Sequence, residues 1–233
     1  MNNMHFDFSP NMFHPFYIIR TGLKNAILSN STFMSGKMLD FGCGSKPYKD
    51  QFNVDEYIGL DYENDGHTHE NEQIDVFYDG QNIPFPDEYF DSVLSSEVFE
   101  HVFNIERVLT EINRVMKKEG KLLITCPFVW NEHEVPHDYA RYTLFALRDL
   151  LDRHGFELVK EEKSGNFIAT IFQLWSLYFY TAFSGLRKGF FLYRWFYKVF
   201  FVFCPNASSF VLEKILPNNK SLYLNNIVVA KKK

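Results

Sequence analysis

The stretch Met38-Leu-Asp-Phe-Gly-Cys-Gly-Ser-Lys-Pro47 decides the fold of this chain. Its apolar run gives way at once to Gly42-Cys-Gly44, which predicts a strand that runs directly into a tight turn. Glycine in such a turn lets the backbone approach a ligand closely. Asp61 follows Gly42 by nineteen residues and ends a second apolar run. An acid at about this distance from a glycine turn holds a ribose diol in doubly wound α/β folds.

The glycine turn leaves three interpretations open: a purely structural turn, a dinucleotide site, or a site for another adenosine compound. The dinucleotide fingerprint has a third glycine where the helix packs closely on the strand. Here Lys46-Pro47 stands in place of a small residue. This departure favours an adenosine ligand other than NAD.

Composition restricts the class of protein. A chain of 233 residues suits one domain with a sizeable insertion. The net charge of −5 gives no general attraction for nucleic acid. Three unpatterned cysteines indicate a reduced chain, and the first residues lack the basic start and apolar core of a signal peptide, so we expect a cytoplasmic protein.

Apolar periodicity predicts strands that alternate with helices. The expected strands are the run before Gly42, then Tyr57–Asp61, Ile74–Asp79, Asp91–Ser96, Lys121–Cys126, Phe156–Glu161 and Leu222–Ala230. The expected helices are Phe16–Leu28, Asn104–Lys118 with its stop at Glu119-Gly120, and Thr143–His154. This alternation predicts an α/β protein, a three-layer αβα sandwich around a mostly parallel, seven-stranded Rossmann-like sheet.

In such sheets ligands bind at the carboxyl ends of the strands. The residues expected to meet at this edge are Gly42, Gly44, Asp61, Asp79, Ser96, Glu97 and the loop after Cys126. A carboxylate accepts hydrogen bonds from a diol or an exocyclic amine, so Asp61 and Asp79 suit a nucleoside.

At this point the sequence resembles the class I S-adenosylmethionine-dependent methyltransferases, specifically the type 11 group. The matching segments are Leu39-Asp-Phe-Gly-Cys-Gly44, Gly59-Leu-Asp61, Asp79-Gly-Gln-Asn-Ile-Pro-Phe85, Phe90-Asp-Ser-Val93, Phe99-Glu-His-Val102, Glu111-Ile-Asn-Arg-Val115 and Lys118-Glu-Gly-Lys121. The resemblance covers about residues 36–163. The segment from His133 to Thr143 also looks like a subgroup often associated with polysaccharide biosynthesis.

The resemblance implies a cofactor and the residues that bind it. S-adenosylmethionine would lie with its methionine portion and ribose around Asp40, Phe41, Gly42, Cys43 and Gly44. Asp61, followed by Tyr62, would take the ribose hydroxyls, Asp79 and Gly80 would take the adenine, and Ser96 and Glu97 would border the sulfonium. The resemblance also implies that the last strand returns to the sheet antiparallel, between strands five and six.

Transfer of the methyl group to a hydroxyl requires a base that removes the hydroxyl proton. We expect His137 to act as this base with Asp138 orienting its imidazole, and His101 is a second candidate. His133, Arg141 and Tyr142 are candidates for binding an anionic or sugar acceptor.

No metal is expected from two histidine motifs in the sequence. His133-Glu-Val-Pro-His137 has the lettering of a zinc-protease motif, but that chemistry needs both histidines on one face of a helix. Pro136 is incompatible with that helix. His67 and His69 lie in a polar run that is typical of a solvated loop.

Residues 167–204 form an aromatic segment with basic residues and no acid. We expect a helical insertion between strands six and seven, in which Arg187, Arg194 and Lys198 share one helical face. A basic, aromatic amphipathic helix is typical of a membrane interface. Peripheral contact with the inner face of the membrane, a cap over the active site and a homodimer interface remain open, and a double crossing is disfavoured by polar residues within Phe167–Phe183.

The sequence therefore predicts four segments: an N-terminal arm and helix (1–35), a cofactor-binding core (36–166), the aromatic insertion (167–218), and the last strand with a basic tail (219–233). The predicted activity is S-adenosylmethionine-dependent O-methylation of a small-molecule, sugar or lipid-linked glycan acceptor. The alternatives are an NAD-linked oxidoreductase and a non-catalytic, membrane-associated binding module of the same fold.

Overall fold

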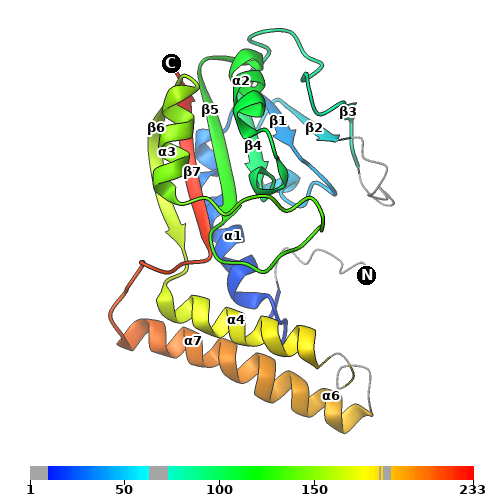
Figure 1. Ribbon diagram of the computed structural model, residues 1–233, viewed down its shortest axis with the longest axis vertical. Helices are drawn as coiled ribbons and strands as arrows, with labels where there is room; N and C mark the ends of the chain where they lie inside the picture. The colour runs from blue at the N-terminus through cyan, green and yellow to red at the C-terminus, as the bar shows by residue number, and fades with distance from the viewer. Residues whose placement is uncertain (1–9, 63–72, 184, 186–189) are drawn as a thin grey trace. The chain divides into compact units, whose positions relative to one another are not determined.

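The computed structural model describes residues 10–62, 73–183, 185 and 190–233 (Figure 1). The chain forms two compact units. The sheet unit comprises Ala26–Glu162 and Asn226–Lys233, and the helical unit comprises Met1–Asn25 and Lys163–Asn225. His67 and His69 lie outside the described residues.

One seven-stranded sheet has the order β3-β2-β1-β4-β5-β7-β6. Its strands are β1 (Lys37–Phe41), β2 (Glu56–Tyr62), β3 (Val76–Tyr78), β4 (Phe90–Ser96), β5 (Met116–Pro127), β6 (Phe156–Ser164) and β7 (Asn225–Lys232). β3, β2, β1, β4 and β5 pair in parallel. Lys233 N donates to Gly155 O and Leu224 N to Ser164 O, so β7 runs antiparallel to β6. The expected Rossmann-like sheet with an antiparallel last strand is confirmed.

Both faces of the central strands are covered. Helices α2 (Ile105–Val115) and α3 (Leu144–Arg153) contribute their apolar stripes to one continuous core with β1, β4 and β5. The strand residues that alternate with this core are also buried, namely Met38, Leu94, Leu123 and Val229. Thr143 caps α3 as expected, because its side chain accepts a hydrogen bond from Ala146 N.

The boundary between α2 and β5 differs from the sequence prediction, which placed residues through Lys118 in the helix. α2 ends at Val115 and the chain is extended from Met116. Met116 pairs with Phe90 of β4 and is fully buried, which a continued helix would prevent. The pairing then shifts register before Lys121 meets Ser92. Tertiary pairing therefore overrides helical periodicity here.

The helical unit contains the expected insertion between β6 and β7. Its helices are α4 (Phe167–Ala182), α6 (Phe191–Tyr197), a π-helix (Lys198–Phe203) and α7 (Cys204–Ile215), together with the first part of α1 (Tyr17–Asn30). Figure 1 shows α4 and α7 side by side. The stretch Phe191–Ile215 is one run of 25 helical residues, which by length and composition alone is sufficient to cross a membrane.

The polarity of α4 and α7 is reversed relative to a water-soluble helix pair. Their buried residues include Thr170, Gln173 and Ser176 of α4 and Asn206 and Ser209 of α7. Their exposed residues include many large apolar or aromatic ones: Phe167, Ile171, Leu174, Trp175 and Tyr178 of α4, and Phe210, Val211 and Ile215 of α7. Three of the polar residues that interrupt Phe167–Phe183 in the sequence, Thr170, Gln173 and Ser176, therefore face the inside of this unit, whereas Thr181 is exposed.

Candidate functional site

The glycine turn begins directly after β1. Gly42 N and Cys43 N both donate to Leu60 O of β2, which fixes the turn to the neighbouring strand. Gly42 has φ +75°, and a Cβ at this position would lie 2.4 Å from Val98 Cγ2. Only glycine combines this backbone conformation with this close approach.

Asp61 binds the glycine turn from the end of β2. Gly44 N donates to Asp61 Oδ2 at 2.7 Å, and Tyr62 N donates to Asp61 Oδ1 at 2.8 Å. The structure thus brings together the two features that the sequence placed nineteen residues apart. Asp61 presents its carboxylate at the carboxyl edge of the sheet, as expected for a group that accepts hydrogen bonds from a ribose diol.

Asp40 is a buried acid at the end of β1. Its carboxyl accepts a hydrogen bond from Tyr57 Oη at 2.5 Å and is almost wholly buried. Burial raises the pKa of Asp40 to about 7, against the lowering effect of the Tyr57 hydrogen bond and with a further increase from the charge of Asp61. Asp40 therefore titrates near neutral pH behind the glycine turn.

Lys46 stands near the position of the third glycine in a dinucleotide fingerprint, and here its side chain forms an ion pair. Its Nζ lies 2.5 Å from Asp75 Oδ2, and its side chain is almost fully buried. Gly59 N donates to the same Asp75 oxygen at 2.7 Å. A Cβ on Gly59 would lie 2.1 Å from Lys46 Cε, so the lysine stem occupies space that glycine leaves open. Lys46 is thus part of the folded turn.

The third strand contributes Asp79 and Gly80 at the same edge. Asp79 Oδ1 accepts hydrogen bonds from Gln81 N and Asn82 N, which lower its pKa and keep it ionised. Gly80 has φ +75°, and a Cβ there would lie 2.7 Å from the ring of Tyr62. Asp79 and Tyr62 are exposed, and their roles toward adenine and ribose remain predictions.

Ser96 and Glu97 follow at the end of β4. Ser96 Oγ and Thr125 Oγ1 are 2.9 Å apart, which ties β4 to β5. Glu97 has φ +57°, and its N donates to Thr125 O. This left-handed conformation at a residue other than glycine marks a sharp change of direction at the strand end. Ser96 and Glu97 are predicted to border the sulfonium because they lie at the end of β4.

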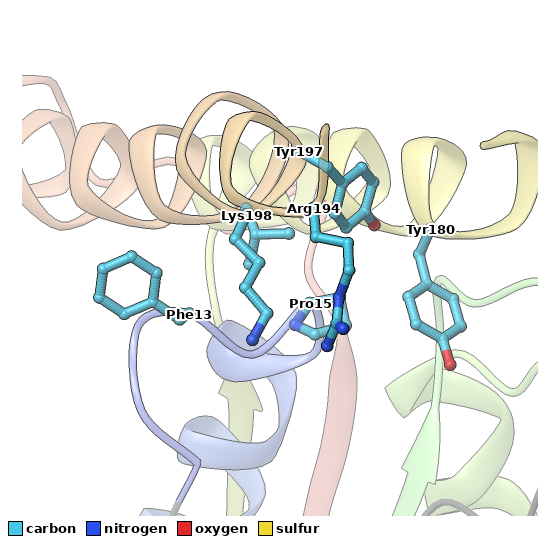
Figure 2. Close-up of a pocket in the computed structure, with 7 residues that line it drawn as sticks. Phe13, Pro15, Tyr180, Arg194, Tyr197 and Lys198 are labelled. Atoms are coloured by element: carbon cyan, nitrogen blue, oxygen red, sulfur yellow. The ribbon is translucent and has the colours of Figure 1, made fainter. Parts of the chain in front are cut away.

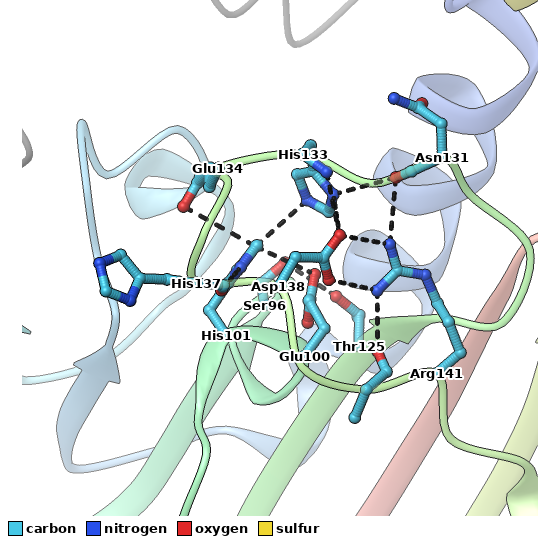
Figure 3. Close-up of polar contacts among 11 residues, drawn as sticks. Ser96, Glu100, His101, Thr125, Asn131, His133, Glu134, His137, Asp138 and Arg141 are labelled. Carbon is cyan, nitrogen blue, oxygen red and sulfur yellow. Dashed lines mark hydrogen bonds and ion pairs between the residues drawn. The ribbon is translucent and has the colours of Figure 1, made fainter.

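Two loops meet beyond the ends of β4 and β5. The 3-10 turn η3 (Phe99–His101) follows β4, and the second loop runs from residue 128 to Thr143. Tyr139 N and Ala140 N both donate to Glu100 O, at 2.8 and 3.2 Å. His101 Nδ1 also lies 2.7 Å from His137 O. These contacts bring His101 and His133 together, with their Nε2 atoms 3.1 Å apart (Figure 3).

The orientation expected for His137 is not the one observed. Its ring bonds the hydroxyl of Tyr139, and it is exposed. Asp138 instead binds Arg141 through two hydrogen bonds of 2.5 and 2.7 Å and accepts a third from His133 N. The Arg141 guanidinium holds the pKa of Asp138 well below its usual range. Asp138 thus orients the loop through Arg141 and His133.

The residues predicted to bind the acceptor, Arg141, Tyr142 and His133, differ in how available they are for a ligand. The charge of Arg141 is already matched by Asp138, and Arg141 Nη2 donates to Asn131 O. Tyr142 packs against the core, and burial raises its pKa to about 12. His133 is the member of this group that lies beside His101.

Glu100 was not singled out as a site residue from the sequence. Its side chain is fully buried, and neither carboxyl oxygen has a hydrogen-bond partner among the described residues. Burial and the nearby charge of Glu97 raise its pKa well above the usual range. Its Oε1 lies 3.8 Å from His101 Nε2. An acid next to His101 in a short turn was the available signal, but burial is not visible in the sequence.

The glycine turn after β1, the acid after β2 and the antiparallel last strand are the features that the resemblance to class I methyltransferases predicts. Residues 39–124 match the type 11 family model described as "Methyltransferase domain". This segment is therefore similar to a methyltransferase family, a class of enzymes that uses S-adenosylmethionine as cofactor. The resemblance to a polysaccharide-biosynthesis subgroup stays a prediction.

Three known proteins illustrate the similarity. An uncharacterized protein of Methanocaldococcus jannaschii is 33% identical over 91 residues, which are 38% of this chain and 43% of the relative. The ubiquinone/menaquinone biosynthesis C-methyltransferase of Bordetella avium is 41% identical over 46 residues, 20% of this chain and 18% of the relative. The structure of an S-adenosylmethionine-dependent methyltransferase from Archaeoglobus fulgidus has a TM-score of 0.56 at 18% identity, covering 90% of this chain and 93% of that one.

The chain spans less than half the length of these two curated relatives. The similarity to the Archaeoglobus structure confirms the fold.

Proposed function

We propose that this chain is an S-adenosylmethionine-dependent methyltransferase that methylates a hydroxyl of a small-molecule, sugar or lipid-linked glycan acceptor. The observation that carries the proposal is the Asp61 carboxylate bound to the glycine turn, within a segment that matches a methyltransferase domain. The acceptor class rests on the histidine pair at the same sheet edge and on the polarity of the helical unit.

The residues at the sheet edge fit this cofactor. Gly42 lets the turn pack closely on Val98, and the carboxyl groups of Asp61 and Asp79 can accept hydrogen bonds from hydroxyl and amino groups. Glu97, the acid at the end of β4, suits a cationic ligand. When bound, S-adenosylmethionine supplies a methyl carbon on a cationic sulfur. The chain's part is to align the acceptor with that carbon, because alignment provides a large share of the rate.

The histidine pair supplies what a hydroxyl acceptor needs. His101 Nδ1 faces a carbonyl oxygen, which only accepts, so in the neutral imidazole Nδ1 carries the hydrogen and Nε2 carries a lone pair. A lone pair on Nε2 can take a proton from a hydroxyl. We therefore place the acceptor hydroxyl beside His101 and His133, and not beside the exposed ring of His137.

The cofactor assignment is tested by calorimetric titration with S-adenosylmethionine and, separately, with NAD. We expect saturable binding of the first and none of the second. Binding of NAD alone would support an oxidoreductase, and binding of neither would remove the proposal. Candidate acceptors are then screened by measuring the S-adenosylhomocysteine that is released. Free sugars and lipid-linked saccharides are tested separately. Cofactor binding without turnover of any acceptor would favour the non-catalytic module.

We propose further that the helical unit rests on the cytoplasmic face of a membrane that contains anionic lipid. The observation that carries this is its reversed polarity. Gln173 is fully buried, where its Oε1 accepts from Ile19 N and its Nε2 donates to Pro15 O. Trp175 and Tyr178, on the same helix, are 49% and 62% exposed. Apolar burial is the dominant favourable term for a helix in water, so an exposed aromatic face indicates another apolar surface.

Basic residues accompany these aromatic residues within the helical unit. A cavity of about 150 Å³ is lined by Phe13, Pro15, Tyr180, Arg194, Tyr197, Lys198 and Val202. Figure 2 shows the side chains of Arg194 and Lys198 reaching past the helix toward Pro15. No acid lines this cavity. A guanidinium and an ammonium at an aromatic surface suit the phosphate of a lipid headgroup. Arg187, the third basic residue of the predicted face, lies outside the described residues.

Liposome flotation tests this surface. We expect the full chain to float with vesicles that contain phosphatidylglycerol and to float less with phosphatidylcholine alone. Arg194→Glu should reduce flotation, whereas Lys118→Glu makes the same charge change on the sheet unit and should not. Absence of flotation, with a dimer in light scattering, would assign the exposed face to a second copy of the chain.

A further inference from the structure

The two loops at the ends of β4 and β5 are held in one arrangement by backbone contacts. Glu100 O accepts from two amides of the second loop, and His101 Nδ1 bonds His137 O. The second loop is stiffened in turn by the Asp138–Arg141 ion pair, in which Asp138 is only 4% exposed. The side chains of Glu100, His101 and His133 are therefore brought together by positioned backbone.

The contacts of Nδ1 in both imidazoles determine which ring nitrogen of each histidine carries the hydrogen. His101 Nδ1 faces His137 O at 2.7 Å, and His133 Nδ1 faces Asn131 O at 3.3 Å and Asp138 Oδ2 at 3.3 Å. All three oxygens only accept hydrogen bonds, so each neutral ring places its hydrogen on Nδ1. Both Nε2 atoms then carry lone pairs, and they lie 3.1 Å apart. Two lone pairs at this distance repel each other unless a cation lies between or beside them.

The carboxyl group of Glu100 is a third candidate metal ligand beside the two Nε2 atoms. Glu100 is fully buried, and its two carboxyl oxygens have no hydrogen-bond partner in the described part of the chain. One ligand atom from each of Glu100, His101 and His133 lies within 4.8 Å of the others. A buried carboxyl group with no hydrogen bond is unfavourable unless a cation or a proton compensates it.

We propose that Glu100, His101 and His133 form a binding site for a divalent transition-metal cation. Two imidazoles and one carboxylate are a common ligand set for such ions, with open positions left for water or substrate. Metal–nitrogen bonds of about 2.0–2.1 Å place two ligand nitrogens roughly 3 Å apart on one ion, close to the distance found here. The hydrogen bonds from both Nδ1 atoms to oxygen are those that orient metal-binding histidines.

This site differs from the zinc-protease motif in the sequence and revises the expectation that the chain binds no metal. Only His133 of that motif takes part, while the ring of His137 bonds Tyr139. The site lies where β4 and β5 end, at the edge where ligands bind in this fold. Its role in the reaction rests on the proposed function and replaces that of His101 as the base, because a metal would occupy the His101 Nε2 lone pair. A cation there would lower the pKa of a bound acceptor hydroxyl, whose proton would leave to solvent.

The binding test uses the full chain treated with a chelator and dialysed. Zn²⁺, Mn²⁺ and Co²⁺ are titrated separately, with elemental analysis for stoichiometry and the visible spectrum of bound Co²⁺ for its nitrogen ligands. We expect about one ion per chain. His101→Ala, His133→Asn and Glu100→Gln should each weaken binding about tenfold or more. His137→Ala should leave metal affinity unchanged, whereas a zinc-protease site would lose it.

The metal site would be overturned if no stoichiometric binding is found, or if His101→Ala and His133→Asn bind metal as well as the unmodified chain. The short distance between the two Nε2 atoms would then be explained by a proton shared between His101 and His133. His133→Asn lies on a loop, so it keeps the test valid if Glu100→Gln does not fold. Titration of S-adenosylmethionine into the same metal-free protein separates the two proposals. Cofactor binding without metal binding would remove only the site, and metal binding without cofactor binding would remove only the proposed function.

Discussion

At the scale of single residues, the glycine turn works through Asp61, which binds the turn and faces the proposed ribose position. Its carboxylate accepts from Gly44 N, so its removal affects both the turn and the cofactor. Hydrogen bonds to a charged group contribute about 1.5–3 kcal/mol each. Asp61→Ala should therefore weaken S-adenosylmethionine binding by roughly tenfold or more.

Calorimetry on Asp61→Ala and Asp61→Asn measures this effect. Asparagine keeps an acceptor for Gly44 N, so it should lose less affinity than alanine. Equal affinity of both variants and the unmodified chain would show that the ribose lies elsewhere.

Asp40 gives a pH prediction. Burial raises its pKa from 3.8 to about 7, so between these values the folded chain holds a proton that the unfolded chain has lost. Stability from this group is fully present below about pH 4 and declines as pH rises to 7. About three pKa units correspond to a total on the order of 4 kcal/mol.

Asp40→Asn removes this titration. Its free energy of unfolding, measured in urea at several pH values from 4 to 8, should fall less with rising pH than that of the unmodified chain. Parallel curves for the two proteins would mean that Asp40 ionises normally in the fold.

At the scale of elements, α4 depends on a polar interior within the helical unit. Gln173 satisfies a backbone donor at Ile19 and a backbone acceptor at Pro15, both far away in sequence. Leaving such buried groups without a partner costs about 1–3 kcal/mol. Gln173→Ala should therefore lower the midpoint of thermal unfolding and increase proteolysis of this unit.

Thr181→Ala is the matched control on the same helix. The Thr181 hydroxyl bonds only carbonyls of its own preceding turn, and the residue is exposed. Its replacement should change stability little. A Gln173→Ala variant as stable as Thr181→Ala would contradict the importance of the buried amide.

At the scale of the whole molecule, the net charge of −5 opposes attraction to anionic lipid, so any such attraction must come from a local basic surface. Arg194 and Lys198 supply that surface among exposed aromatic residues. We expect flotation with phosphatidylglycerol vesicles to fall, but not vanish, between about 0.1 and 1 M salt, because salt screens charge and leaves apolar contact intact. Flotation that is insensitive to salt would exclude a basic contribution.

Much of the sheet unit was predictable because its signals are local. Strand ends at Gly42 and Asp61 follow from apolar runs that stop at glycine or acid, and Thr143 is a helix cap by residue type. The end of α2 was not predictable from periodicity, since Met116 fits both a helical stripe and the strand that pairs it with Phe90.

The sequence by itself determined the class of fold, the glycine turn, the acids that follow the next strands and the helical insertion, because periodicity and chain order specify them. Only the tertiary structure decided which histidines meet. His101 and His133 are separated by 32 residues and face each other because backbone groups of two loops bind one another. It also decided that Gln173 and its polar neighbours point inward while aromatic residues point outward, since burial depends on what each helix packs against.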